Sequence, residues 1–335
     1  MPKLVEALLR HSQHYLAVLR SANELYEQGD EQLNRGLALY DLELRNIQVG
    51  FPYTEDWAKD SRTISLCNAY PMAGFYLLNL RLNPEERLHW FKAGHEAARL
   101  LKDRSAEGIH VGNIGYAYSH LGEDSKALKY YKKFLRISRE IRDEQSQTNA
   151  LGLLGLAYLN LHDNIQAASS FEEELAFARK VKNRRAEGVA LNHLSLMYAL
   201  SDKPQRAIET WEEDLKISRE IGDTHNEGTT LGNMGISYNK LGKKYRALDL
   251  YQQHIGIARK LGDKSGEARS LWNTSLLLAE LGRYDAAISA AEEVLKIHEQ
   301  IDEDETHQIE NVRNHIAHWR EGSSPPKVTL WTGSF

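Results

Sequence analysis

The sequence contains one cysteine, Cys67, and only seven prolines among 335 residues. A single thiol provides neither an internal disulfide nor a cysteine-based zinc cluster, which is typical of a protein in the reducing cytoplasm. Between residues 85 and 324 the one proline is Pro204. Because proline interrupts helices, its scarcity favours long helices over this stretch. We therefore expect a cytoplasmic, mainly helical protein.

Long apolar runs and a strong charge of one sign are also lacking. No run of about 18 apolar residues is present that could span a membrane. The first residues, MPKLVEALLRHSQ, lack the apolar core and cleavage site of a signal peptide. The 42 basic and 47 acidic residues leave a net charge of -5, which provides no general electrostatic reason to bind nucleic acid. We expect neither a membrane nor a nucleic-acid partner.

What the sequence does contain is a repeat of 40 residues, present in five copies without an insertion. A small residue recurs at Gly115, Gly155, Ser195, Gly235 and Ser275. Three residues later come Tyr118, Tyr158, Tyr198, Tyr238 and Leu278. Alanine then recurs at Ala127, Ala167, Ala207, Ala247 and Ala287, followed by Tyr131, Phe171, Trp211, Tyr251 and Ala291. A polar residue recurs at Asp103, Asp143, Asn183, Asp223 and Asp263. Apolar spacing within each copy predicts two helices, which the small residues allow to approach closely.

Two copies, IGYAYSHLGEDSKALKYY (114–131) and MGISYNKLGKKYRALDLY (234–251), resemble tetratricopeptide repeats. The resemblance implies an all-α fold, a right-handed α-solenoid of antiparallel helix pairs. Arginine replaces the usual proline near the end of the second helix, as in the longer repeats of kinesin light chains and spindle-orientation adaptors; these arginines are Arg139, Arg179, Arg219 and Arg259. Each lies four residues before an Asp or Asn, and this spacing predicts an ion pair or cap at the helix end.

Outside the repeats, the chain divides into four further segments. We expect an N-terminal helical region over 1–66 and a degenerate helix pair over 67–107 before the five repeats of 108–307. A capping helix over 308–321 and a flexible tail over 322–335 follow. Within the first region we expect helices over 3–27 and 31–49. Residues 10–50 also resemble the segment that precedes the repeat array in bacterial STAND-class signalling NTPases, through His14-Tyr15-Leu16, Leu42-Glu43 and Asn46-Ile47.

Motifs for catalysis, metals or cofactors are lacking. The stretch from Gly235 to Lys244 contains a Gly-Lys pair but has the wrong spacing for a P-loop, and Lys244 replaces the Ser or Thr that would bind magnesium. The pairs His11/His14 and His315/His318 have no evident third ligand for zinc. We therefore expect no enzyme activity, no catalytic residue, no metal and no cofactor.

The second helix of the first full repeat is strongly basic, with Lys126, Lys129, Lys132, Lys133, Arg136, Arg139 and Arg142. Such a helix could contact an acidic partner or phosphate groups. A solvated outer face is the simpler interpretation, and no aromatic residues are interleaved for stacking on bases.

The family resemblance places peptide binding on exposed positions of the first helix of each pair, which line a concave groove. The candidate groove residues are Asn113, Tyr116, Asn149, Leu156, Asn192, His193, Leu196, Asn233, Ile236, Asn239, Trp272 and Asn273. An amide side chain both donates and accepts hydrogen bonds, so it can hold a peptide backbone whatever its sequence. In the kinesin light chain and spindle-adaptor relatives an asparagine ladder does this, which implies a similar role here. Alternatively, the asparagines form hydrogen bonds between adjacent repeats. The lysine-rich carboxylate clamp of chaperone-binding relatives is not matched, because Ile109 and Gly112 stand at its basic positions.

Three functions remain open. The first is a non-enzymatic adaptor or scaffold that binds a protein or peptide in the groove. The second is the ligand-sensing arm of a STAND-type signalling NTPase, which a P-loop and winged helix upstream in the reading frame would favour. The third is self-association, in which Val328-Thr329-Leu330-Trp331 of the tail occupies its own groove or that of a neighbour.

Overall fold

The computed structural model describes residues 2–28, 30–56, 60–301 and 306–323. These residues form sixteen α-helices and no strand, which confirms an all-α fold. The chain divides into two compact units, Met1–Phe177 and Ala178–Phe335.

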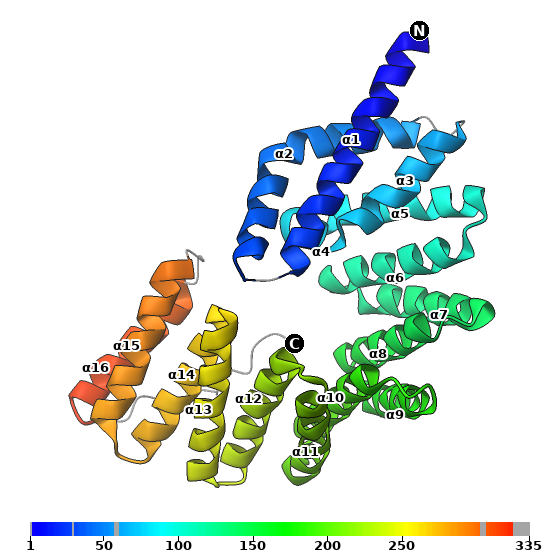
Figure 1. Ribbon diagram of the computed structural model, residues 1–335. Helices are drawn as coiled ribbons and strands as arrows, with labels where there is room; N and C mark the ends of the chain where they lie inside the picture. Colours follow the sequence, from blue (N-terminus) through cyan, green and yellow to red (C-terminus); the bar gives the residue numbers. More distant parts are fainter. Residues whose placement is uncertain (1, 29, 57–59, 302–305, 324–335) are drawn as a thin grey trace. The chain divides into compact units, whose positions relative to one another are not determined.

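The first unit begins with five helices that differ from the repeats in length and sequence. They are α1 (Pro2–Glu27), α2 (Asp30–Asp56), α3 (Ser61–Ala73), α4 (Phe75–Arg81) and α5 (Pro84–Leu101). Helices α1 and α2 lie side by side (Figure 1). The second helix runs to Asp56 rather than Val49, and the boundary expected between residues 66 and 67 falls inside α3.

Aromatic side chains form the core of this N-terminal helical region. The rings of Phe51 and Trp90 stack with centroids 4.1 Å apart, and Tyr70 lies against both. The Tyr70 hydroxyl donates to the Ser12 carbonyl at 2.8 Å, and the Ser12 hydroxyl donates to the Gly50 carbonyl at 3.0 Å. Buried polar groups need such partners, so these bonds fix how α1, α2 and α3 pack.

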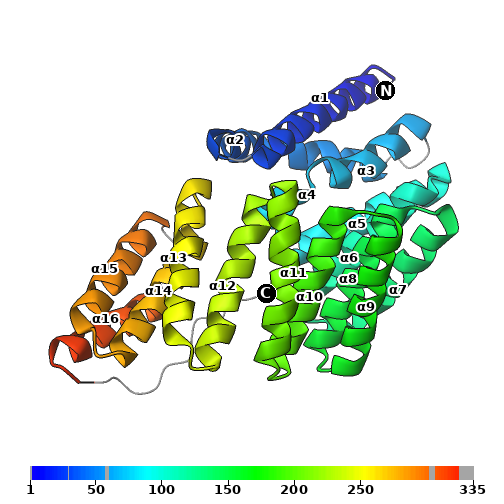
Figure 2. The same ribbon diagram turned by 60° about the horizontal axis from the view of Figure 1, so that its bottom comes forward.

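Repeat helices complete the first unit and make up the second. In the first unit they are α6 (Arg104–His120), α7 (Asp124–Ile141), α8 (Glu144–Asn160) and α9 (Asn164–Lys180), and α9 contains the division between the units. In the second unit they are α10 (Arg184–Leu200), α11 (Pro204–Ile221), α12 (Thr224–Lys240), α13 (Lys244–Leu261), α14 (Lys264–Glu280), α15 (Tyr284–Ile301) and α16 (Thr306–Arg320). Within each unit, neighbouring helices pack in sequence order, as α5 to α7 and α12 to α14 do in Figure 2.

The repeated residues explain why each pair forms. The side chain of the recurrent Asp or Asn accepts a hydrogen bond from a backbone N–H three residues later, so it is the N-cap of the first helix; these caps are Asp103, Asp143, Asn183, Asp223 and Asp263. A Cβ at Gly115 would lie 2.6 Å from the Tyr131 ring, and one at Gly235 would lie 2.5 Å from the Tyr251 ring. Glycine at these two positions therefore makes room for the aromatic ring of the second helix against the first.

Consecutive pairs also meet through matched side chains 16 residues apart. A Cβ at Gly94 would lie 2.5 Å from the His110 ring, so glycine makes room for the imidazole. The Thr230 hydroxyl donates to the Asp214 carboxylate at 2.7 Å. His254 Nδ1 and the Ser270 hydroxyl are 2.6 Å apart. These three interfaces thus each contain a different complementary pair, matched in size or in polarity.

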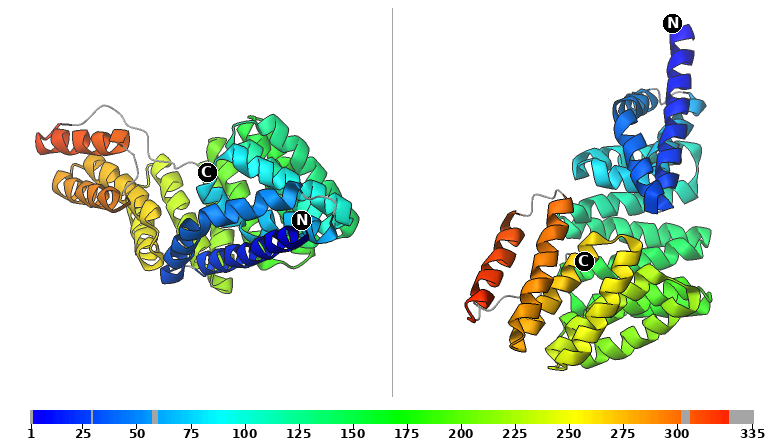
Figure 3. Two further views of the ribbon diagram at one scale, coloured as in Figure 1. Left: turned by 90° about the horizontal axis from the view of Figure 1, so that it is seen from above. Right: turned by 60° about the vertical axis from the view of Figure 1, so that its left-hand side comes forward.

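The last helix, α16, covers the end of the second unit and lies along α15 (Figure 3). Val312, Ile316 and Trp319 are buried in one apolar cluster with Trp272 of α14. Solenoids need a helix of this kind because their last repeat otherwise exposes its apolar face. The tail segment proposed for self-association lies outside the described residues.

Candidate functional site

Ion pairs between neighbouring helix pairs position the first helix of each pair in the second unit. Arg179, Arg219 and Arg259 donate through Nε to Glu187, Glu227 and Glu267 at 2.8, 2.7 and 2.6 Å. Each glutamate lies in the first turn of the following first helix. Of the ion pair or cap expected from the Asp or Asn four residues ahead of each arginine, the structure shows a cap, because that side chain caps the next helix.

Two of these arginines, Arg179 and Arg259, also reach a second carboxylate on the second helix of the next pair. Arg259 Nη2 lies 2.6 Å from Glu293, and Arg179 Nη2 pairs with Glu213. In the first unit Arg139 pairs with Glu173. The acidic positions of the second helices are thus used in ion pairs.

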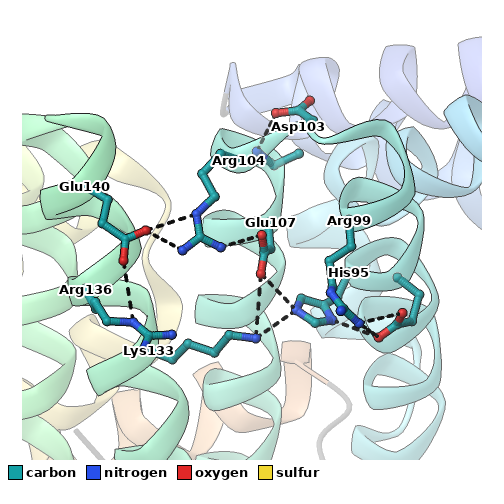
Figure 4. Close-up of polar contacts among 10 residues, drawn as sticks. His95, Arg99, Asp103, Arg104, Glu107, Lys133, Arg136 and Glu140 are labelled. Carbon is teal, nitrogen blue, oxygen red and sulfur yellow. Dashed lines mark hydrogen bonds and ion pairs between the residues drawn. The ribbon is translucent and has the colours of Figure 1, made fainter.

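At the start of the repeats, Lys133 replaces this second glutamate and the network changes around Glu107 (Figure 4). Arg104 Nη1 reaches one carboxylate oxygen of Glu107 at 2.6 Å, while His95 Nε2 and Lys133 Nζ approach the other at 3.6 and 3.8 Å. Burial raises the pKa of Glu107, but the Arg104 hydrogen bond and the nearby cations outweigh it and lower the pKa overall. Burial and the Lys133 charge lower the pKa of His95.

The basic face of α7 is largely compensated within the chain. Lys126 pairs with Glu123, Arg136 lies 3.7 Å from Glu140, and Lys132 lies 5.5 Å from the centre of the Tyr158 ring. These contacts favour a solvated outer face over a phosphate-binding surface.

In the first unit, the candidate groove residues lie on α6 and α8. Asn113, Tyr116 and Leu156 are half-buried and Asn149 is exposed. The Tyr116 ring contacts the rings of His120 and Phe75, with centroids 4.4 and 6.0 Å apart. Asn149 accepts a hydrogen bond from Gln145 of its own helix at 3.0 Å. The Asn113 amide makes no hydrogen bond to any residue that the structure describes.

In the second unit, Asn192, His193, Asn233, Ile236 and Asn239 are half-buried on α10 and α12. Asn192 donates to Asn226 of α12 over a long 3.4 Å, which is a bond between repeats. For Asn233, no hydrogen bond joins its amide to the described part of the chain. A bond between repeats is therefore observed for Asn192, whereas the amides of Asn113 and Asn233 make no hydrogen bond to the described residues.

Three expected groove residues are buried, and this corrects their assignment to an open surface. Leu196 is 8% exposed, Trp272 is 3% exposed and Asn273 is 1% exposed. The Trp272 ring packs against His315 and Trp319 of α16, with centroids 5.1 and 6.2 Å apart. The helix that closes the solenoid thus covers this part of α14.

Sequence reasoning missed two buried polar groups of the second unit. Asp214 is fully buried and accepts hydrogen bonds from Asn226 and Thr230, both at 2.7 Å. Burial raises its pKa to about 6 despite these bonds. Burial lowers the pKa of His254 to about 4. The 40-residue register contains a signal for both, because Asp214 and His254 stand where the first repeat has the apolar Phe134.

The described residues contain neither a cluster of metal ligands nor a membrane-spanning helix. Within the described ranges, no group of three or more His, Cys, Asp or Glu side chains is placed to hold a metal ion. None of the described helices combines the length and apolar character needed to cross a membrane.

Comparisons with known proteins agree with this architecture. Family models described as tetratricopeptide repeat match residues 112–141, 186–260 and 228–300. No curated protein matches the sequence. BtubC from P. vanneervenii has a similar structure, with 18% identity and a TM-score of 0.59 over 65% of this chain and 92% of that one.

Two further solved structures align over almost the whole chain. Aspartyl phosphate phosphatase F from Bacillus subtilis has 14% identity and a TM-score of 0.61, covering 96% of this chain and 97% of its own. A STAND protein with a tetratricopeptide repeat sensor from Pyrococcus horikoshii has 18% identity and a TM-score of 0.56 over 94% of this chain. The chain spans 53% of that STAND protein's length. At these identities the likeness concerns the fold.

Tetratricopeptide repeats are generally non-enzymatic binding scaffolds. The repeated helix pairs, their caps and their glycine–aromatic contacts account for the matches with the family models. Residues 112–141 and 186–300 are therefore tetratricopeptide repeats, the family whose models match them.

Proposed function

We propose that this protein is a cytoplasmic, non-enzymatic scaffold that binds a peptide or protein segment on the first helices of its repeats. The supporting observation is the burial and hydrogen bonding of the side-chain amides of Asn113 and Asn233. Both are half-buried, and neither amide bonds to the described residues. An amide in this position is ready to exchange hydrogen bonds with a ligand backbone.

Apolar side chains stand next to these amides and would select among ligands. Tyr116 lies one turn after Asn113, and Ile236 lies three residues after Asn233; both are half-buried. Such residues contribute affinity when a ligand side chain covers them, while the amides hold its backbone. A structural neighbour is a Rap protein complexed with competence and sporulation factor, with 13% identity and a TM-score of 0.57. In that complex a similar fold binds a separate factor, which supports a binding role here.

The second candidate is a sensor role within a larger signalling NTPase. It is favoured by the alignment of nearly the whole chain with about half of a STAND protein. In that case the same helix faces bind the ligand, and an ATPase domain responds. Sequencing the native reading frame upstream of Met1 for a P-loop distinguishes the two roles.

A random peptide library displayed on phage tests the proposed surface directly. Peptides selected on the wild-type protein should lose at least tenfold in affinity for Asn113→Ala or Asn233→Ala, depending on the unit that they occupy, because one or two hydrogen bonds are worth about 1.4 kcal/mol together. Lys129→Ala and Gln252→Ala, exposed on second helices α7 and α13, are the matched controls.

Two outcomes would reject the proposal. One is a library in which no peptide is enriched on the folded protein. The other is a set of peptides that bind both asparagine variants as tightly as wild type, which would move binding away from the first helices. Light scattering of the protein with and without residues 323–335 tests self-association separately.

A further inference from the structure

Arg87, in α5 of the first unit, is an arginine at a position that the repeats reserve for alanine. Forty residues later stands Ala127, and the series continues with Ala167, Ala207, Ala247 and Ala287, all fully buried. Arg87 is itself only 4% exposed. A charged side chain is costly to bury, and a residue that breaks a local structural rule is often functional.

Among the residues that the structure describes, the charge of Arg87 has no acidic partner. No carboxylate of the described residues lies within ion-pair distance of its guanidinium. Nη1 donates to the side-chain oxygen of Asn79 at 2.8 Å and approaches the Asn79 carbonyl at 3.3 Å. The Asn79 amide nitrogen in turn donates to the Phe75 carbonyl at 2.8 Å, so both groups are held in one orientation. Burial lowers the pKa of Arg87, as expected for an uncompensated charge.

The other edge of the guanidinium, formed by Nε and Nη2, makes no hydrogen bond to the described residues. Nε is fully buried and has no hydrogen-bond partner among the described residues. Nη2 also makes no hydrogen bond to them, but it is not fully buried. The Nε–H and one Nη2–H point the same way and together match the two oxygens of a carboxylate. Arg81 shows this geometry in the same unit, with Nε and Nη2 at 2.7 and 2.8 Å from the Asp41 carboxylate.

Arg87 also lies beside the candidate ligand surface of α6. The Tyr116 side chain lies close enough to Arg87 to interact with it electrostatically. Burial lowers the pKa of His120, and the positive charge of Arg87 lowers it further. Tyr116 and His120 are in ring contact at the end of α6. A hydroxyl and an imidazole can both donate to an anion.

We propose that the free Nε/Nη2 edge of Arg87 is an oxyanion-binding site, which takes a carboxylate or phosphate group of a ligand lying on α6. The ligand part of this inference rests on the proposed function, whereas the anion site itself does not. The bound oxyanion supplies the missing negative charge and the missing acceptors. Because Nε is covered in this structure, an anion can reach it only if the atoms that cover it move aside.

Arginine side-chain NMR together with thermal unfolding tests the site without any peptide. The probes are sodium acetate and inorganic phosphate at ionic strength matched with sodium chloride. The Nε–H resonance of Arg87, assigned by its loss in Arg87→Met, should shift saturably with acetate, phosphate or both. The Arg81 resonance is the control, because its edge already binds Asp41. The unfolding midpoint of wild type should rise with the same anion.

The variants separate an anion site from a structural role. Arg87→Met should unfold at the same temperature as wild type or higher without anions, since it removes an unpaired buried charge, and its response to the anion should disappear. A response to phosphate alone that disappears in this variant identifies a phosphoryl group as the ligand. If Arg87→Met does not fold, Arg87→Lys, which retains the charge without the planar edge, provides the assignment and should respond less.

The proposal is overturned if the Arg87 resonance shifts with neither anion, or if Arg87→Met responds as wild type does. These results do not bear on the phage selection, in which peptide binding depends on Asn113 and Asn233.

Discussion

Asp214 should make the second unit less stable as the pH rises, and Asp214→Asn should remove that dependence. The carboxyl is fully buried, and its pKa is about 6 in the folded protein against an ordinary value of 3.8. A raised pKa means that the folded state favours the neutral form. The stabilisation is therefore complete below the unfolded pKa and is lost as the pH rises through about 6.

The size of the effect follows from the difference in pKa. About two units at 1.36 kcal/mol each amount to about 2 to 3 kcal/mol between pH 4 and pH 8. Asparagine has almost the same shape and can still accept from Asn226 through its carbonyl oxygen, so the variant isolates the charge. Relative to wild type, Asp214→Asn should therefore gain about 2 to 3 kcal/mol of unfolding free energy over this range.

Urea unfolding of both proteins, followed by circular dichroism at several pH values, measures this difference. His254 titrates in the opposite sense, since burial lowers its pKa to about 4, but it contributes equally to both proteins and cancels. The reasoning is refuted if the difference in unfolding free energy between wild type and variant is the same at pH 4 and pH 8.

Two further predictions concern packing in the second unit. Gly235→Ala should destabilise the protein by about 1 to 3 kcal/mol because the new methyl group meets the Tyr251 ring. A methyl group at Gly256 would have no atom within 4 Å apart from its own helix backbone, so Gly256→Ala should stabilise the protein by about 0.5 to 1 kcal/mol. Urea unfolding that ranks the two variants otherwise contradicts the packing. Trp319→Ala should cost about 3 to 5 kcal/mol and increase hydrogen exchange in α16 and α14, while Arg313→Ala, on the exposed side of α16, should change neither measurement.

The local features of the fold could be predicted from the sequence, since they depend on neighbours along one helix or one turn. The 40-residue register located the pairs, and glycine at Gly115 and Gly235 predicted the close approach that Tyr131 and Tyr251 require. The partners of the recurrent arginines could not be predicted. Arg259 reaches Glu293, 34 residues away, and that distance depends on how successive pairs stack.

The candidate site was less predictable because exposure depends on what packs over a helix. Trp272 and Asn273 have the sequence position of groove residues, yet α16 covers this part of α14. Arg87 presents the opposite case. Its mismatch with Ala127 is visible in the register, but only the structure shows that its side chain is buried with no carboxylate of the described residues at ion-pair distance.

The matched pairs between consecutive repeats have a consequence for folding. Similar repeats can associate out of order, as multidomain and repeat chains do when they misassemble. Here Asp214 docked against the preceding first helix would face Ala190 instead of Thr230, and would lose the Thr230 hydroxyl as a donor. The His110 ring likewise fits only against a residue without a Cβ, which Gly94 provides. These interfaces therefore favour the correct neighbour over another repeat, which helps near-copies to assemble in order.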